Sequence, residues 1–599
     1  MPEAVAPPTD AAVSIGVTQS DFDSDVMAAW PAAVAIAAGD LSRRFPRRGF
    51  VRSWELPGAD LGLPESLVLA IDADLPWSLP RVGLLVQPEL CVMPHVEEDG
   101  IFCLTPSTAA ASVPVGIGHA RQLVQEAVDA YHQGASGANR EDFLKEFGTY
   151  WELGQKASGH GELWITDLAR TQSLFVASNG ATFYAADSRE RLVSWLESRD
   201  VSDKNIRLAM YIKLANPLYP QDYPKTTADV ISLVATAGED GCRLLAAALK
   251  VKQRLTVLMG FEHGNTIIVG AARADIENRF RDHRGQGQQF IAAPGRRNIS
   301  ETHLLNRLAQ ARFPVTRVSV TRADSRYLNF RTAGDVPEEL RSARIGVIGC
   351  GALGGAIAMR LAQSGARNLT LIDGDVLKIE NVGRHELGAS YIGRYKSEGM
   401  RDEIQGRYCD YKVKSIPTTW QKAFKDTPNA LEQCDLLIAA TGDWLSNAHL
   451  NALAAELQMP IVYCWLERYA LAGHGLLVMP GGACLQCVSN EFGDFDHQVS
   501  MLGGELPTDP SCGGHYQPFS AYASNQAASM MVKLVLDTIE GRLQTSQLRT
   551  WVVPYDEFDR VGARINENWH SALVVEGGFE RTFRRELHRH KACSGPHSQ

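Results

Sequence analysis

Residues that can hold a phosphate chain are concentrated between positions 349 and 396. The glycines have the G-x-G-x-x-G spacing that lets a backbone turn approach phosphate at the start of a helix, at Gly349, Gly351 and Gly354. Acidic, amide and cationic side chains follow in the order Asp373, Asp375, Asn381, Arg384 and Lys396. The first carboxylate can serve a ribose, and the later donors and cations stand where a triphosphate would lie. This order predicts nucleotide chemistry.

The elements that must position these residues form a nucleotide-binding βαβ unit. An apolar run at 345–348 enters the glycine turn, an amphipathic helix follows, and a second strand at 368–372 ends just before Asp373. Dehydrogenases share this unit, so the glycines alone do not separate ATP from a nicotinamide or flavin. A dehydrogenase needs little beyond the acidic residue, whereas here an amide and two cations follow. The downstream residues therefore favour ATP.

Asp443 ends a second buried strand, DLLIAATGD, at 435–443. A carboxylate at a strand end is well placed to hold Mg²⁺. Arginine, lysine and Mg²⁺ converging on a phosphate chain is the arrangement that nucleotidyl transfer needs. The alternative is that Arg384 and Lys396 are surface charges and that Asp443 caps the next helix.

This ordered series resembles the ATP-dependent adenylating domain of ubiquitin-activating enzymes and of their sulfur-carrier relatives of the ThiF and MoeB type. The resemblance covers residues from about 340 to 545. It implies a Rossmann-like fold in which Asp443 holds Mg²⁺ and Asp373 the ribose. It also implies phosphate contacts from Asn381, Arg384 and Lys396.

Two positions depart from the family pattern or leave it open. His385 stands where the family has a glutamine after its Asn-x-x-Arg motif. The family also uses an arginine just upstream of the first strand. Arg326 and Arg331 are both candidates for that role, and the sequence does not choose between them.

The cysteines of this region indicate two kinds of chemistry. Cys484 and Cys487 follow a Pro-Gly-Gly turn, and relatives combine such a pair with a second pair to hold structural zinc. Here Cys593 is the thiol far enough downstream to help, and two reduced thiols are the alternative. Cys512 lies in a Pro- and Gly-flanked loop near His515, which could favour its thiolate. The family has its thioester-forming cysteine there; a third zinc ligand or an inert thiol are the alternatives.

A further cysteine, Cys103, follows a Pro-His pair and an acidic glycine turn near the N-terminus. Residues from about 20 to 135 resemble a ubiquitin-conjugating enzyme core, whose catalytic cysteine lies eight positions after an asparagine. His95 occupies that asparagine position. In the family this residue stabilises the oxyanion as an amine attacks a thioester, and an imidazole could donate a similar hydrogen bond. Taken alone, such a cysteine is more often a buried thiol.

The whole chain is expected to be a multidomain α/β protein. It has 599 residues, of which 45% are hydrophobic, and a net charge of −10. The charge argues against direct binding of nucleic acid. We expect a ubiquitin-conjugating-like α+β core at 1–155, an α/β or α+β linker domain of unknown role at 156–330, and a Rossmann-like ThiF adenylation domain with a basic tail at 331–599. The apolar runs are too short to cross a membrane, and eleven cysteines without a regular framework favour the cytoplasm.

Fusions in this order occur in bacterial CBASS anti-phage operons, and the chain resembles that family. The resemblance implies ATP-dependent adenylation of a protein C-terminus, a thioester relay through Cys512 and Cys103, and ligation to an amine-bearing target. It also implies a cGAS/DncV-like nucleotidyltransferase as the acyl donor, and a homodimer. The alternatives are an adenylating enzyme for a ubiquitin-like or sulfur-carrier protein of another operon, and a nucleotide-binding scaffold without ligase activity.

Overall fold

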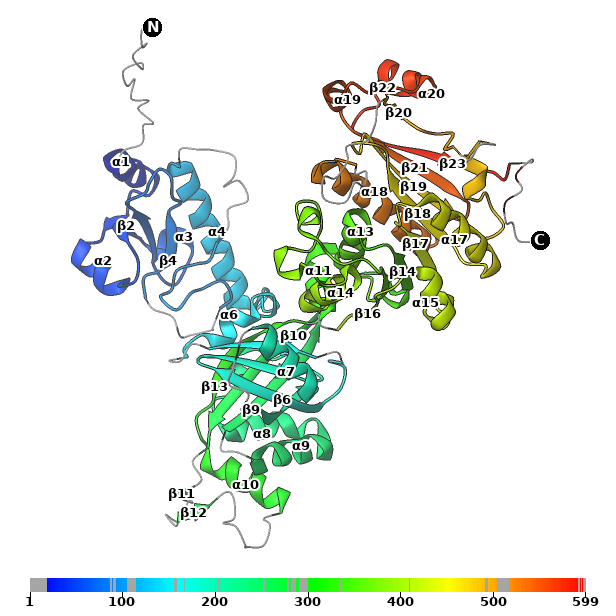
Figure 1. Ribbon diagram of the computed structural model, residues 1–599. Coiled ribbons are helices and arrows are strands. Elements are labelled where there is room, and N and C mark those ends of the chain that lie inside the picture. Colours follow the sequence, from blue (N-terminus) through cyan, green and yellow to red (C-terminus); the bar gives the residue numbers. More distant parts are fainter. Residues whose placement is uncertain are drawn as a thin grey trace, which may run out of the picture. The chain divides into compact units, whose positions relative to one another are not determined.

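The protein divides into two compact units, one ending at Arg322 and one beginning at Ala323 (Figure 1). The computed structural model describes residues 19–86, 89, 93–104, 115–155, 159–165, 167–199, 201, 205–251, 254–264, 266–276, 279–281, 287–289, 300–333, 336–408, 410–490, 494–503, 517–590, 593 and 595.

The first unit begins with a four-stranded antiparallel sheet. In spatial order its strands are β1 (Val34–Ala35), β2 (Phe50–Leu56), β3 (Leu67–Asp72) and β4 (Arg81–Leu84). Its helices are α1 (Gln19–Ala29), α2 (Ala38–Arg44), α3 (Gly58–Leu61) and α4 (Ile117–Ser136). Trp54 and Leu69 are cross-strand partners, so their side chains point to the same face and pack with Leu123 of α4 in one core.

A closed barrel of seven strands forms the rest of the first unit (Figure 1). Around the barrel the order is β10 (Thr266–Asp275), β13 (Thr316–Arg322), β5 (His160–Trp164), β7 (Thr182–Ala186), β6 (Gln172–Asn179), β8 (Arg207–Lys213) and β9 (Arg254–His263). The pairs β13–β5, β5–β7 and β8–β9 are parallel and the others antiparallel. Closure removes the exposed sheet edges that seven strands would otherwise leave.

Helices pack around the barrel and lead into it. They are η1 (Pro220–Asp222), α7 (Arg189–Ser198), α8 (Thr227–Ala235), α9 (Gly238–Val251) and α10 (Glu301–Ala311), and a short hairpin adds β11 (Arg279–Arg281) and β12 (Gly287–Gln289). Two short helices, α5 (Asp142–Lys145) and α6 (Phe147–Glu152), precede the first barrel strand. Trp151 of α6 is fully buried among barrel residues, and its Nε1–H donates to the carbonyl oxygens of Ala271 and Val318, both at 3.1 Å. The barrel core therefore anchors α6.

The second unit is built on an eight-stranded mixed sheet. In spatial order the strands are β16 (Lys412–Ile416), β15 (Asn368–Ile372), β14 (Arg344–Ile348), β17 (Leu436–Ala439), β18 (Ile461–Leu466), β19 (Ala472–Val478), β21 (Gln547–Val552) and β23 (Thr582–Glu586). The first five are parallel and the last three join antiparallel. A separate two-stranded ladder pairs β20 (Ser500–Met501) with β22 (Arg564–Ile565).

Helices cover both faces of this sheet, as a parallel sheet requires. One core contains side chains of α12 (Glu338–Ser342), α13 (Ala352–Gln363), α14 (Lys396–Arg407) and α18 (Ala521–Ile539). The other contains side chains of α15 (Trp420–Asp426), α16 (Asn429–Glu432) and α17 (Trp444–Glu456). The remaining elements are α11 (Ser325–Ala333), α19 (Tyr555–Val561), α20 (Glu567–His570), η2 (Ile379–Asn381), η3 (Ala389–Tyr391), η4 (Leu485–Val488) and η5 (Ser571–Val575).

Across the described residues, none of the helices combines the length and the apolar character that crossing a bilayer demands.

Candidate functional sites

The strand order of the second unit reverses direction between β14 and β17. In open α/β sheets, ligands bind in the crevice at the carboxyl ends of the strands at such a point. A cavity of about 430 Å³ lies there. Of the predicted nucleotide contacts, the cavity is lined by Gly351, Asn381, Arg384 and Lys396 but not by Gly349, Gly354, Asp373, Asp375 or Asp443. Trp444, Trp465 and Phe519 add aromatic surface to it.

The three glycines of the turn have different roles. Gly349 has φ +90°, and a Cβ there would lie 2.4 Å from the carbonyl oxygen of Ala440. A Cβ on Gly354 would lie 1.9 Å from the carbonyl oxygen of Gly349. These two glycines therefore serve close packing between the turn, α13 and the end of β17. A Cβ on Gly351, the N-cap of α13, would meet nothing within 4 Å, so the turn is open at that position.

Asp373 holds the glycine turn through its carboxylate. Its Oδ2 accepts the Cys350 N–H at 2.6 Å, and its Oδ1 accepts the Asp375 N–H at 2.7 Å. Lys396, the first residue of α14, places its Nζ 2.9 Å from Asp375 Oδ2. The lysine side chain is 12% exposed whereas that of Asp375 is 76% exposed. Lys396 is thus a largely covered cation at the cavity wall, and the ribose contact of Asp373 stays a prediction.

Arg384 is the second cation of the cavity. Its Cζ lies 5.1 Å from the centroid of the Phe519 ring, which holds the guanidinium by a cation–π contact. Among the described residues, no carboxylate lies within ion-pair distance of it. Asn381 accepts the Lys378 N–H through Oδ1 at 3.1 Å, which leaves its amide N–H₂ to donate. Within the described part of the chain, an anion could reach Arg384 without first breaking an ion pair.

His385, at the family's glutamine position, supports the glycine turn. Its Nδ1 accepts the Leu387 N–H at 3.0 Å, so Nε2 carries the proton and donates to the carbonyl oxygen of Cys350 at 2.7 Å. Burial lowers the pKa of His385. The ring is therefore a neutral support of the turn, with both nitrogens bonded to backbone.

Asp443 is the N-cap of α17. Its Oδ1 accepts the Leu445 N–H at 3.2 Å, and its Oδ2 accepts the Ser446 N–H at 3.1 Å. The side chain is exposed, and each carboxylate oxygen keeps a lone pair beyond the capping bond. Capping and Mg²⁺ binding are compatible on these grounds, and the metal role of Asp443 stays a prediction.

The remaining candidate residues of this unit are Arg326, Arg331 and Cys512. Arg326 of α11 is exposed and does not line the cavity, and nothing further is assigned to Arg331. Cys512 lies outside the described residues. The described chain resumes at Gln517, which lines the cavity together with Phe519.

The three cysteines predicted to bind zinc do come together. The Sγ atoms of Cys484, Cys487 and Cys593 lie within 4.8 Å of one another, with Cys484 3.9 Å from Cys487 and 3.7 Å from Cys593. Tetrahedral zinc with Zn–S bonds of about 2.3 Å requires sulfur–sulfur separations of about 3.8 Å. Burial raises the pKa of Cys593 to about 12, whereas backbone hydrogen bonds at His590 and Cys484 outweigh burial and lower that of Cys487. A divalent cation would let all three ionise.

We expect the purified chain to carry one zinc ion that is lost in Cys487→Ser. Removing one of three thiolates leaves too few ligands, and the thermal midpoint of the second unit should fall with the metal content. Metal analysis by mass spectrometry after dialysis checks the stoichiometry. Cys242→Ser, in α9 of the other unit, is the matched control and should keep the zinc. Metal-free wild-type protein would leave the three cysteines as reduced thiols.

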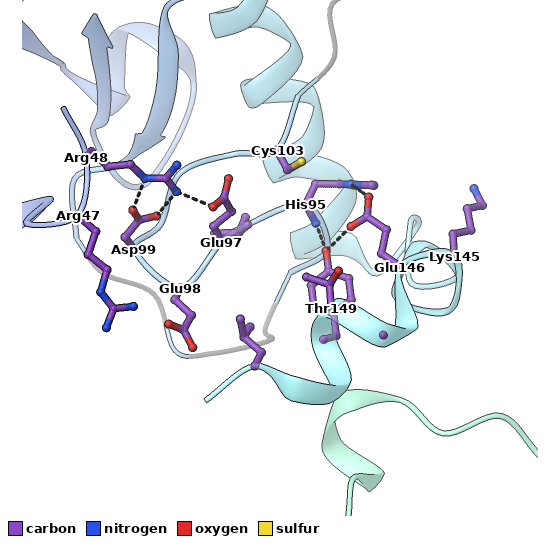
Figure 2. Close-up of a pocket in the computed structure, with 14 residues that line it drawn as sticks. Arg47, Arg48, His95, Glu97, Glu98, Asp99, Cys103, Lys145, Glu146 and Thr149 are labelled. Atoms are coloured by element: carbon purple, nitrogen blue, oxygen red, sulfur yellow. Dashed lines mark hydrogen bonds and ion pairs between the residues drawn. The ribbon is translucent and has the colours of Figure 1, made fainter. Parts of the chain in front are cut away.

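Cys103 is an exposed thiol in a second cavity, of about 890 Å³ (Figure 2). Its N–H donates to the carbonyl oxygen of His95 at 2.7 Å, and Val96 and Phe102 bridge the two sides of the turn between them. His95 has φ +61°, a conformation that a residue other than glycine adopts at a cost. Burial, and then the carboxylates of Glu146 and Glu97, raise the pKa of the Cys103 thiol.

Two carboxylates flank the ring of His95. Nε2 lies 3.1 Å from Asp142 Oδ2. On the other side of the ring, Nδ1 lies 3.5 Å from Glu146 Oε1 (Figure 2). The predicted oxyanion contact of His95 would therefore need one ring nitrogen to exchange its carboxylate neighbour. That role stays a prediction.

Sequence reasoning missed the residues of α5 and α6 that surround His95. Asp142, Glu146 and Tyr150 lie some forty residues beyond Cys103, within the expected domain at 1–155 but beyond residues 20–135, the span that resembles a conjugating core. The two acidic residues are four apart, which puts them on one side of a helical turn, but a surface helix carries the same pattern. The sequence holds no signal that would have found them.

Comparisons with known proteins match both ends of the chain. Residues 325–568 match the ThiF family, and residues 28–158 match prokaryotic E2 family B. The ATP-dependent ubiquitin transferase-like protein Cap2 of Pseudomonas aeruginosa is 28% identical over 559 residues, which cover 87% of this chain and 95% of the relative. Molybdopterin-synthase adenylyltransferase of Escherichia coli K12 is 26% identical over 165 residues, 27% of this chain and 64% of the relative.

Solved structures are also similar over part of the chain. Among them, E. coli MccB with ATP is 17% identical, covers 45% of this chain and 72% of its own, and has a TM-score of 0.32. The two family matches confirm the predicted fold class, with a conjugating-type domain first and a ThiF adenylation domain last.

Proposed function

We propose that this chain, a Cap2 homologue with a prokaryotic E2 family B domain followed by a ThiF domain, joins a protein C-terminus to an amine at the expense of ATP. The observation that carries the proposal is the cavity at the switch point, where Arg384 and Lys396 face an open glycine turn in a chain that also presents the exposed thiol of Cys103.

The first step is adenylation of a carboxylate. ATP would lie over the turn at Gly351, with its phosphates contacted by Asn381, Arg384 and Lys396. These donors bind and orient the phosphate chain so that a carboxylate oxygen can attack the α-phosphorus. Asp443 would help to hold Mg²⁺, which would neutralise charge on the departing pyrophosphate. The product is an acyl adenylate, which is a good acyl donor.

The later steps use cysteines. The thiolate of Cys512 takes the acyl group and releases AMP, and exchange with Cys103 passes it on as a second thioester, which is nearly isoenergetic. An amine of the target then forms the stable amide. Carrying both cysteines on one chain raises the effective concentration for the exchange. By family resemblance the acyl donor is the C-terminus of a cGAS/DncV-like nucleotidyltransferase in CBASS defence, and the enzyme acts as a homodimer.

We expect ATP–pyrophosphate exchange that depends on the carrier's tail. Wild-type protein with full-length nucleotidyltransferase should exchange label, and a carrier lacking its last few residues should not. Asp443→Asn should raise the Mg²⁺ concentration needed for half-maximal exchange by about tenfold or more, because the amide still caps α17 but binds Mg²⁺ poorly.

The outcomes separate the rival readings. Exchange with a ubiquitin-like or sulfur-carrier protein instead of the nucleotidyltransferase would identify a different carrier for the same chemistry. Nucleotide binding without exchange under any of these conditions would favour a scaffold and end the enzymatic proposal.

A further inference from the structure

The Cys103 pocket has walls from two different parts of the first unit. Both walls lie within the stretch that matches prokaryotic E2 family B. One wall carries Cys103 and His95, and the other is the α5–α6 segment with Glu146 (Figure 2). Tyr150 of α6 also lines the pocket. The opposite side of α6 is buried in the barrel through Trp151. The barrel core thus fixes the position of the second wall.

Glu146 is held by two contacts at the junction of these walls. The Tyr150 hydroxyl donates to Glu146 Oε2 at 3.1 Å, and the same hydroxyl oxygen accepts the His95 N–H at 2.6 Å. The other oxygen, Oε1, lies 3.5 Å from His95 Nδ1. Burial raises the pKa of the Tyr150 phenol, so the hydroxyl remains a donor. Tyr150 therefore links the strained turn at His95 to the carboxylate of Glu146.

The other acidic residues that line the pocket are Glu97, Glu98 and Asp99. Arg48 bonds to Asp99 at 2.8 Å and to Glu97 at 2.5 Å, and Glu98 accepts the Gly154 N–H at 2.9 Å. Asp142 lies outside the lining, and its Oδ1 is 2.6 Å from the Lys145 Nζ.

Glu146 differs from Glu97, Asp99 and Asp142 in its partners. Among the residues that the structure describes, no lysine or arginine lies within ion-pair distance of it, its basic neighbour is the His95 ring, and its side chain is 37% exposed. A cation entering the pocket would find in Glu146 an oriented carboxylate that no described lysine or arginine pairs with.

The position of Glu146 hinders the loading of Cys103 with an acyl group but favours the transfer of that group to an amine. Burial is the main cause of the raised pKa of the Cys103 thiol, and the nearby carboxylate of Glu146 raises it further by disfavouring the thiolate. Glu146 therefore slows the uptake of an acyl group. An amine acceptor arrives as an ammonium ion, which cannot attack until it loses a proton. A negative group beside the thioester attracts that ion and can receive the proton.

We propose that Glu146 binds the incoming ammonium group and accepts its proton at the Cys103 thioester, with Tyr150 as its positioning residue. This rests on the proposed function for the presence of a thioester on Cys103. The acceptor is accordingly a primary alkylammonium, such as a lysine side chain, rather than a hydroxyl or a thiol. The segment α5–α6 is then the acceptor side of the site.

Attack of the amine on the Cys103 thioester begins with a proton transfer. The ammonium gives one proton to the Glu146 carboxylate, and the freed nitrogen lone pair attacks the thioester carbonyl carbon, forming the C–N bond. The tetrahedral intermediate collapses with cleavage of the C–S bond, and the sulfur keeps that electron pair. The second nitrogen proton goes to the departing thiolate, whose raised pKa favours the thiol. Glu146 returns its proton to solvent, so ammonium and thioester give amide, thiol and one proton.

The test is discharge of a Cys103 thioester made without ATP. A synthetic peptide thioester acylates Cys103 by thiol exchange, and peptide mapping by mass spectrometry follows the acyl group on that residue. Glu146→Gln should slow discharge by free lysine about 10- to 100-fold at neutral pH. Discharge by hydroxylamine, which is already uncharged at neutral pH, should stay within about twofold. Equal lysine discharge in wild type and Glu146→Gln would overturn the proposal.

Alkylation of the free thiol gives an independent readout of opposite sign. Removing the carboxylate lowers the pKa of Cys103, so the pH midpoint of iodoacetamide alkylation should move down and the rate at neutral pH should rise. A variant that merely disturbs the fold would not slow one reaction and speed the other. Glu146→Asp should recover part of the lysine discharge, and Tyr150→Phe should slow it without abolishing it.

A matched control and a separate arm distinguish the two proposals. Glu141→Gln removes the same charge one helical turn away, where the carboxylate accepts from Tyr219 and does not line the pocket, and it should leave all three rates unchanged. Loading of Cys103 from ATP and the carrier protein is measured in parallel. Failure of that loading refutes the relay, whereas the peptide thioester still decides the role of Glu146.

Discussion

Cys103→Ala is expected to abolish the amide product while leaving a reducible acyl adduct on Cys512. Activation and the first thioester need only the second unit, so they should survive a change in the first. Without the Cys103 thiol, the acyl group has no sulfur beside Glu146 from which an amine can take it. We expect amide formation to fall by about 10³-fold or more, as is usual when a catalytic nucleophile is removed. Intact mass under non-reducing and reducing conditions separates thioester from amide.

Two further variants make this result specific. Cys512→Ala should remove both the adduct and the amide, because the acyl group cannot leave the adenylate by the relay. Cys242→Ala, which changes a thiol of α9 away from the pocket, should do neither. Undiminished amide in Cys103→Ala would exclude the conjugating role of this cysteine, whatever the fate of the adenylate.

The nucleotide half of the protein could be predicted because its residues are close in the sequence. The glycine turn and the donors beyond it occupy one stretch of about fifty residues, and a βαβ unit has few ways to fold. Which of these residues line the cavity and which support the glycine turn could not be predicted. Asp373 and His385 support the turn through backbone hydrogen bonds, and this depends on distances that sequence spacing does not contain.

Only one wall of the Cys103 pocket could be predicted from the sequence. The spacing of His95 and Cys103 points to a thioester site, but the wall made by Glu146 and Tyr150 depends on α6 being packed in the barrel. The sequence pattern of the central region predicts individual strands, but it does not predict that they close into a barrel. Closure needs the parallel pairing of β13 with β5, which joins residues more than 150 positions apart. Periodicity is local, so it carries no information about such a pair.

The candidate zinc site also depends on a contact between residues that are far apart in the sequence. Cys484 and Cys487 form a local pair, whereas Cys593 lies more than 100 positions away and joins them within tetrahedral distance. A thiol is small and apolar enough to sit in many environments. Only the folded positions of the three sulfurs separate a metal site from scattered free cysteines.

Arg384→Ala is expected to lower ATP–pyrophosphate exchange by about 10²- to 10³-fold in kcat/KM, which corresponds to about 3–4 kcal/mol of transition-state stabilisation. The reason lies in the different surroundings of the two cavity cations. Lys396 is already paired with Asp375 at 2.9 Å, so part of its charge is neutralised before ATP arrives. Arg384 is held by the Phe519 ring, and no carboxylate of the described residues pairs with it, so its charge and its donors are less engaged than those of Lys396 before phosphate arrives.

Arg384→Lys should recover only part of the exchange activity, because an ammonium is a point charge that cannot make the two parallel bonds of a guanidinium. Arg394→Ala is the matched control: Arg394 lies in the same loop, pairs with Asp402 and does not line the cavity, so exchange should persist. Lys396→Ala should cost less than Arg384→Ala, because Asp375 already neutralises part of the lysine's charge before ATP binds. If Arg384→Ala exchanged label at the wild-type rate, the phosphates could not lie across this cavity, and the adenylation proposed for the second unit would need another site.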